Sequence, residues 1–175
     1  ILSTTGSSHT HNIFNNTIRN FTGGTGTVYG IHRTLASGSI YENSVYNLAG
    51  GGTIYGLSNG TGTNNIYRNN INNLSTSSTA TTAGLVSGIY ISGVTNHYVY
   101  NNFISDLKAP LAASTDAIRG INCTATTASS NLGLYYNTIY LNATSSGANF
   151  GTSGIYHTNS TTSTTAQLDM RDNIV

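Results

Sequence analysis

The sequence predicts an all-β solenoid, a single segment over residues 1–175 with about six coils of three short strands each. Two observations carry this prediction. An asparagine flanked by apolar residues recurs every 26 to 36 residues, a repeat length typical of coils that bury their apolar side only against neighbouring coils. Within each repeat the apolar residues alternate with polar ones, and this period of two indicates strands rather than helices.

The recurring asparagines define the coils. Each has an apolar residue three positions before it and another two positions after it, as Ile40 and Val45 flank Asn43. We expect the side-chain amides to stack in a ladder, because an amide both donates and accepts hydrogen bonds at the strand spacing of about 4.8 Å. Asparagine tolerates the left-handed backbone conformation, so we expect these residues to make the bend between strands. The predicted ladder consists of Asn16, Asn43, Asn69, Asn102, Asn137 and Asn173.

A glycine followed by Ile or Leu opens five of the coils. The clearest copy of the repeat is Gly88–Leu107, and Tyr29–Leu48 and Tyr55–Leu74 are close copies of it. Cys123, two residues after Ile121, is expected to point into the core, and as the single cysteine it cannot form an internal disulfide. The opening glycines are Gly30, Gly56, Gly88, Gly120 and Gly154.

Both ends of the chain lie within apparent strands, since it begins at Ile1-Leu2 and ends at Ile174-Val175. Neither end shows a polar capping segment, so both ends are predicted to be uncapped. Open strand edges pair readily with further strands. We therefore expect a segment of a longer solenoid, or one unit of an end-to-end stack of identical chains.

The composition argues against several partners. With 6% charged residues and a formal net charge of +1, the chain has no electrostatic footprint for nucleic acid or for an anionic membrane surface. No apolar run is long enough for membrane insertion as a helix. The five histidines show no metal-ligand spacing and no phosphate-binding loop occurs, so no cofactor is predicted.

An aromatic column is the main candidate for binding. It stands two residues before the ladder asparagines, on the side that alternation places outside, and Arg171 interrupts it in the last coil. Stacked rings would stabilise neighbouring coils, and exposed rings could also contact sugar rings of a surface glycan. Both interpretations stay open at this point. The column is formed by Phe14, Tyr41, Tyr67, Tyr100 and Tyr135.

Charged residues gather in only one region, where Asp106, Lys108, Asp116 and Arg119 flank one loop. They could form a site for a sugar acid, or a solvated loop with a local ion pair. Glu42 precedes one ladder asparagine and Arg68 the next, so this pair is expected to face each other at the surface. No residue is assigned a catalytic role.

The order of residues in the fourth coil resembles a known repeat. Gly88, Ile89, Ile91, Asn96, Val99, Asn101, Asn102 and Ile104 reproduce the pattern of the right-handed parallel β-helix of pectate lyase-like proteins and many bacterial surface proteins. The stretches Asn101–Pro110, Tyr135–Ala143 and Asn149–Thr158 are similar to Thr/Asn-rich β-helix regions of large secreted Bacteroidota proteins. Those proteins carry a type IX secretion sorting signal, which this chain lacks.

The resemblance implies a right-handed parallel β-helix in a secreted or cell-surface protein, with the type IX secretion machinery as its export partner. This scaffold carries enzymes, adhesins and spacers alike, so the fold alone does not give the function. Because no residue is assigned a catalytic role, we expect a non-catalytic structural or adhesive segment of a surface or filament protein. The alternative is a carbohydrate-binding or carbohydrate-active β-helix, its active coils elsewhere or at the 106–119 loop.

Overall fold

The computed structural model describes residues 1–4, 9–93, 96–124, 130–158 and 166–175. Every regular element within these ranges is a β-strand. The same ranges contain no helical segment that could span a bilayer. The all-β class predicted from the alternating pattern is confirmed.

The strands form three parallel sheets. The first sheet contains β1 (Leu2–Ser3), β4 (Val28–Leu35), β7 (Ile54–Thr61), β10 (Val86–Ile91), β13 (Ile118–Cys123) and β16 (Thr152–His157). The second sheet contains β2 (Ile13–Phe14), β5 (Gly38–Tyr41), β8 (Asn64–Tyr67), β11 (Asn96–Tyr100), β14 (Asn131–Tyr135) and β17 (Gln167–Arg171). The third sheet contains β3 (Thr17–Thr22), β6 (Ser44–Gly50), β9 (Asn70–Thr76), β12 (Phe103–Lys108) and β15 (Thr138–Tyr140).

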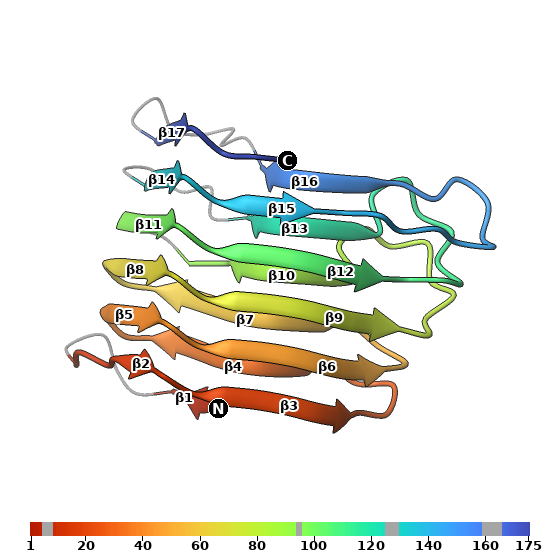
Figure 1. Cartoon of the computed structure of the whole chain (residues 1–175), viewed down its shortest axis with the longest axis horizontal. Helices are drawn as coiled ribbons and strands as arrows, with labels where there is room; N and C mark the ends of the chain where they lie inside the picture. Colours follow the sequence, from red (N-terminus) through yellow and green to blue (C-terminus); the bar gives the residue numbers. More distant parts are fainter. Residues whose placement is uncertain (5–8, 94–95, 125–129, 159–165) are drawn as a thin grey trace.

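Successive coils contribute one strand to each sheet in turn, and every strand pairs with its counterparts one coil away. Figure 1 shows the chain climbing in a right-handed sense from the N-terminal to the C-terminal coil. The register repeats the sequence alignment: Ile31 pairs with Leu57, and Leu57 with Ile89. The chain is therefore a right-handed parallel β-helix of about six coils, as predicted.

The core consists of aliphatic columns that run along the solenoid axis. Ile40, Ile66 and Val99 of the second sheet are fully buried and lie in register on one another. Ile71 and Ile104 form the matching column of the third sheet. Each coil thus covers the apolar residues of its neighbours, which no coil could bury alone.

The asparagine ladder is confirmed in detail. The backbone N and Nδ2 of Asn43 donate to Oδ1 of Asn69 at 3.1 and 3.0 Å. The same Nδ2 contacts the carbonyl oxygens of Ile13 and Tyr41 at 2.9 and 3.0 Å. The amides of Asn43, Asn69 and Asn102 therefore each tie three segments of backbone together. The pattern joins Asn16, Asn43, Asn69, Asn102, Asn137 and Asn173.

The expectation that these asparagines make the bend was wrong. The left-handed conformation belongs to the residue before each of them, with φ between 51° and 55°: Asn15, Glu42, Arg68, Asn101, Tyr136 and Asp172. A ladder asparagine must keep its side chain inward to reach its partners, whereas the preceding side chain points to solvent. The turn is consequently open to several residue types, although a left-handed residue other than Gly costs about 1 kcal/mol.

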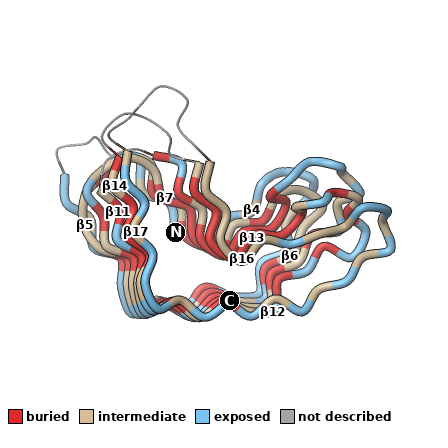
Figure 2. The backbone as a smooth tube through the Cα atoms, turned by 90° about the horizontal axis from the view of Figure 1, so that it is seen from above, coloured by how far each residue is buried: buried red, intermediate tan, exposed pale blue. Residues whose placement is uncertain are grey.

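The opening glycines bring the first sheet against the third. A Cβ atom added to Gly88 would lie 2.5 Å from Cγ2 of Ile104 and 2.8 Å from the carbonyl oxygen of Gly120. Gly56 has the same relation to Ile71 and to Gly88. We call this line of contact the waist, formed by Gly30, Gly56, Gly88, Gly120 and Gly154 against Val45, Ile71, Ile104, Ile139 and Val175. Figure 2 shows the coil narrowing there, with the connections from the third to the first sheet on its far side.

A second bend lies within the strands of the third sheet and was not anticipated. Asn20, Asn47, Asn73 and Asp106 have φ between 50° and 61°. Their exposed side chains form an outer ladder, in which Nδ2 of Asn47 donates to Oδ1 of Asn20 at 3.0 Å and Nδ2 of Asn73 donates to Oδ1 of Asn47 at 2.6 Å. The bend turns the end of each strand toward the connection behind the waist.

The interior is not wholly apolar. Arg33, fully buried, donates to Oδ1 of Asn59 at 2.9 Å, to Oδ1 of Asn64 at 2.6 Å and to the carbonyl oxygen of His11 at 2.9 Å. Burial lowers the pKa of its guanidinium to about 10, so it stays charged at neutral pH. Nδ1 of buried His97 lies 3.3 and 3.5 Å from the two asparagine amides. This polar cluster fills the corner between the first and second sheets in the N-terminal half of the solenoid.

Candidate functional site

The aromatic column lies on the outer face of the second sheet, as expected from alternation. The rings of Phe14, Tyr41, Tyr67 and Tyr100 stack with centroid distances of 4.9, 4.8 and 4.9 Å and interplanar angles of 3°. Rings in this offset arrangement stabilise each other by about 0.5–1.5 kcal/mol per pair. Since each inner ring lies between two others, mainly ring edges and hydroxyls face the solvent.

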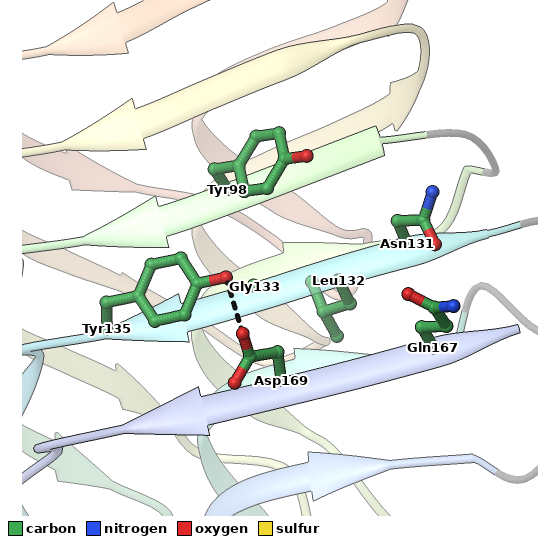
Figure 3. A pocket seen from close by; sticks show the side chains of 7 residues that line it. All are labelled: Tyr98, Asn131, Leu132, Gly133, Tyr135, Gln167 and Asp169. Atoms are coloured by element: carbon green, nitrogen blue, oxygen red, sulfur yellow. Dashed lines mark hydrogen bonds between the residues drawn. The ribbon is translucent and has the colours of Figure 1, made fainter.

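The stack ends at Tyr100, and the expectation that Tyr135 continues it was wrong. Tyr135 pairs with Tyr100 in the backbone register, but its ring turns along the strand and lies over Gly133, two residues earlier (Figure 3). A Cβ at Gly133 would come within 2.5–2.7 Å of Oη, Cζ and Cε2 of Tyr135. Only glycine leaves room for this orientation, in which Oη lies 3.2 Å from Oδ2 of Asp169.

Two hollows adjoin the displaced ring. The larger, of about 350 Å³, lies between Tyr100 and Tyr135. Its lining consists of Asn65, Tyr98, Tyr100, Asn101, Tyr135 and Tyr136. The smaller, of about 250 Å³, is also lined by Tyr98 and Tyr135 and is drawn in Figure 3. Its lining consists of Tyr98, Asn131, Leu132, Gly133, Tyr135, Gln167 and Asp169.

The hydroxyl groups of Tyr100 and Tyr135 stay protonated at physiological pH. Partial burial and the neighbouring Tyr67 raise the pKa of Tyr100. Partial burial and the hydrogen bond to Asp169 raise the pKa of Tyr135. The hydrogen bonds from Arg171, at 3.0 and 2.5 Å, lower the pKa of Asp169. The surface therefore presents ring faces, amides and hydroxyls, with its one charged pair at the edge of the smaller hollow.

The four charged candidates belong to two different sheets. Nζ of Lys108 lies 2.9 Å from Oδ2 of Asp106 and 3.0 Å from Oδ1 of Asn73, so this exposed pair extends the outer ladder. Asp116 and Arg119 form a more buried pair at 2.6 Å on the outer side of the first sheet. The four residues do not build one common site.

The Asp116–Arg119 pair is held by further contacts. Nη1 of Arg119 donates to Oδ1 of Asn122 at 3.0 Å, and its guanidinium carbon lies 3.3 Å from the ring centroid of Tyr156. Oγ of Ser153 donates to Oδ1 of Asp116 at 2.6 Å. These contacts link two neighbouring coils, and Nδ2 of Asn122 reaches a third by donating to Oγ of Ser87 at 3.0 Å.

Cys123 and the Glu42–Arg68 pair lie where the sequence predicts them. Cys123 is fully buried, as expected, and burial raises the pKa of its thiol to about 12. Glu42 and Arg68 face each other at 3.4 Å on the surface, as expected. Within the described part of the chain, no three histidine, cysteine or acidic side chains gather as a metal site.

Sequence reasoning located the aromatic column but missed the hollows beside it. Among their other lining residues, Asn131 and Gln167 stand six residues before a ladder asparagine, as Asn96 does, but Ser37 and Thr63 stand there in earlier coils. Tyr98 has no aromatic counterpart in any other coil. The available signal was Gly133, which stands in an outward strand position where neighbouring coils carry Asn65 and Tyr98. A glycine two residues before a tyrosine leaves space for its ring.

The fold and this surface define the chain as a parallel β-helix solenoid with an outer aromatic column. Comparisons of the chain with protein-family models, with curated protein sequences and with solved structures found no significant match.

Proposed function

We propose that this chain is a non-catalytic structural and adhesive segment of a secreted bacterial cell-surface or filament protein. The observation that supports this proposal is the inner asparagine ladder, which bonds each coil to the next from Asn16 to Asn173. A rod whose coils are all joined by side-chain and backbone hydrogen bonds resists bending and pulling along its axis. Such a rod suits a stalk that holds a binding surface away from the cell.

The structural part is tested by mechanical extension. The chain is held by tags at its two ends and pulled in a single-molecule instrument. We expect it to resist and then lengthen in steps, because each coil makes its contacts only with its neighbours. Extension without resistance, at the force that stretches an unfolded chain, contradicts the stalk role.

The location is tested on the source cells with an antibody raised against the folded chain. Labelling of intact cells or of their filaments is the expected result. Labelling that appears only after the cells are permeabilised contradicts a surface role. Source cells whose type IX secretion machinery has been inactivated by mutation provide the control. Loss of surface labelling in these cells would support type IX secretion as the export route.

The adhesive part is supported by the outer face of the second sheet. The two hollows combine ring faces with amide and hydroxyl groups, which is the chemistry that fits a carbohydrate: ring C–H groups pack on an aromatic face while hydroxyls bond to amides. The expected partner is a surface glycan. A glycan array probed with the folded chain tests this part, and retention of no glycan would contradict it.

A further inference from the structure

The aromatic stack of the second sheet has one open ring position. Rings occupy the column from Phe14 to Tyr100 at intervals of 4.8–4.9 Å. The next residue of the column is Tyr135, whose ring lies over Gly133 instead. The larger hollow, about 350 Å³, thus lies where a fifth ring of the stack would be.

One face of Tyr100 is consequently different from the other ring faces. Its first face is covered by Tyr67 at 4.9 Å. Its second face turns toward the following coil, where Tyr135 and Tyr136 form the opposite wall of the hollow. A ligand ring that entered there would continue the stack and be held between two aromatic walls.

The remaining lining decides which kind of ring fits. The lining is mostly apolar, and its polar groups belong to the amides of Asn65 and Asn101 and to the tyrosine hydroxyls. These groups can donate and accept hydrogen bonds around the edge of a ring. No residue of this lining carries a charge. The two nearby arginines, Arg68 and Arg171, are paired with Glu42 and Asp169, so the hollow itself offers no charged group to an acidic or basic ligand.

We propose that a neutral pyranose unit of a polysaccharide binds in this hollow, stacked on Tyr100 and facing Tyr135. A pyranose has apolar C–H faces and a rim of hydroxyl groups, which matches ring walls combined with amides. The site lies on the outer face of the second sheet, between the coils of β11 and β14 and away from both ends of the solenoid. We refer to it as the ring slot.

The ring slot rests on the adhesive part of the proposed function and gives it a location and a ligand class. It also assigns Gly133 a role in binding. By allowing Tyr135 to turn away from Tyr100, Gly133 keeps the slot open. A side chain at this position would push the Tyr135 ring off the strand and back toward the column.

The test measures binding of the folded chain to immobilised neutral glucans, mannans and xylans, to polygalacturonate and to p-cresol. Four variants are compared with the parent chain. Tyr100→Ala removes the stacking face, and Gly133→Ala closes the slot from the other side. Tyr46→Ala and Tyr140→Ala are the controls, since each removes an aromatic ring of the third sheet, away from the slot. Melting curves establish that each variant is folded.

The expected result is binding of a neutral polysaccharide that Tyr100→Ala and Gly133→Ala each weaken by about three- to ten-fold, the range of one ring contact. Tyr46→Ala and Tyr140→Ala are expected to leave the affinity unchanged within about two-fold. The Gly133→Ala result is the more telling, since this variant leaves every aromatic residue in place.

Other outcomes overturn the inference. If a neutral polysaccharide binds but neither Tyr100→Ala nor Gly133→Ala weakens it, the ring slot is wrong while the adhesive function stands. Binding of p-cresol alone, or of polygalacturonate alone, refutes the neutral pyranose as the ligand. If nothing is retained, the ring slot and the adhesive part both fail, and only the structural part remains.

Discussion

A single buried amide of the inner ladder serves several backbone segments at once. Nδ2 of Asn69 contacts Oδ1 of Asn102 at 3.0 Å and the carbonyl oxygens of Ile40 and Tyr67 at 2.9 and 3.1 Å. Its Oδ1 accepts from Asn43. Replacing it would leave these buried groups without partners, which costs more than the net gain of the hydrogen bonds themselves.

We therefore expect Asn69→Ala to lower the free energy of unfolding by about 3 kcal/mol, from several unsatisfied buried groups. Asn72→Ala is the matched control, because the bond from Asn72 to Asn70 is exposed, and a change within about 0.5 kcal/mol is expected there. Chemical denaturation followed by circular dichroism measures both. If both substitutions changed the free energy of unfolding by the same amount, the buried ladder would contribute no more to stability than an exposed hydrogen bond.

His97 makes the stability depend on pH. Its Nε2 lies 3.1 Å from the carbonyl oxygen of Gly93, and its Nδ1 faces the amides of Asn59 and Asn64, an arrangement that suits the neutral ring with the proton on Nε2. Desolvation by burial, together with the nearby charge of Arg33, lowers the pKa of His97 to about 4, against the opposing effect of Gly93. Protonation of the folded state is thus disfavoured.

The unfolded chain takes up this proton near pH 6.5, whereas the folded chain does so only near pH 4, so stability is lost as the pH falls between these values. The loss attributable to His97 amounts to about 3 kcal/mol at pH 4. His97→Leu, which matches the in-register Leu132, is expected to flatten this dependence of the melting temperature. An unchanged slope between pH 6.5 and 4 in the variant would assign the effect to other groups.

At the level of strands, the waist is the contact that fixes how the sheets approach each other. We expect Gly88→Ala to lower the free energy of unfolding by about 2–3 kcal/mol, because the added methyl group would overlap Ile104 and the backbone of Gly120. Gly26→Ala is the control, as nothing lies within 4 Å of a Cβ there. Thermal unfolding of both variants decides the matter, and a Gly88→Ala chain as stable as its control would mean that the waist can widen freely.

The strands were predictable where one residue type repeats. The inner ladder and the aliphatic columns follow from Asn and from Ile, Leu and Val at constant spacing, since these positions face a core that admits little else. The turn residues escaped prediction because exposed left-handed positions accept Glu42, Arg68 and Tyr136 as well as Asn. The outer ladder also escaped prediction, although its bend leaves a trace in the apolar pattern: the buried residues Ile71 and Leu74 stand three residues apart rather than two.

The binding surface was only half predictable. The column from Phe14 to Tyr135 is visible as a periodic aromatic, but the direction in which Tyr135 points depends on Gly133 and Asp169. The second of these lies one coil away, in β17. An irregular side-chain orientation that depends on a neighbouring coil has no period to detect.

For the molecule as a whole, Cys123 reports on opening of the solenoid. It is fully buried in β13 and its pKa is raised to about 12, so it should react with a thiol reagent only when the coils separate. We expect labelling at neutral pH to be at least about 1,000-fold slower than in denaturant.

A Cys123→Ala/Thr17→Cys chain is the control, because Thr17 is exposed and its cysteine should react at once. Rapid labelling of Cys123 in the folded chain would contradict tight stacking of the coils around it. Labelling that slows in step with the stability of the chain would identify the reacting species as the opened solenoid.

The waist has a consequence for what this molecule can tolerate. Behind it, the connections between the third and the first sheet, at 51–53, 77–85, 109–117 and 141–151, are not all of one length. Gly56 and Gly120 nevertheless contact Ile71 and Ile139 in the same way. Ala109, Ala112 and Ala117 line that side with small side chains. A foreign peptide inserted into one of these connections would therefore be displayed on the outside of the solenoid, at the level of that coil. The register between the paired strands would not change.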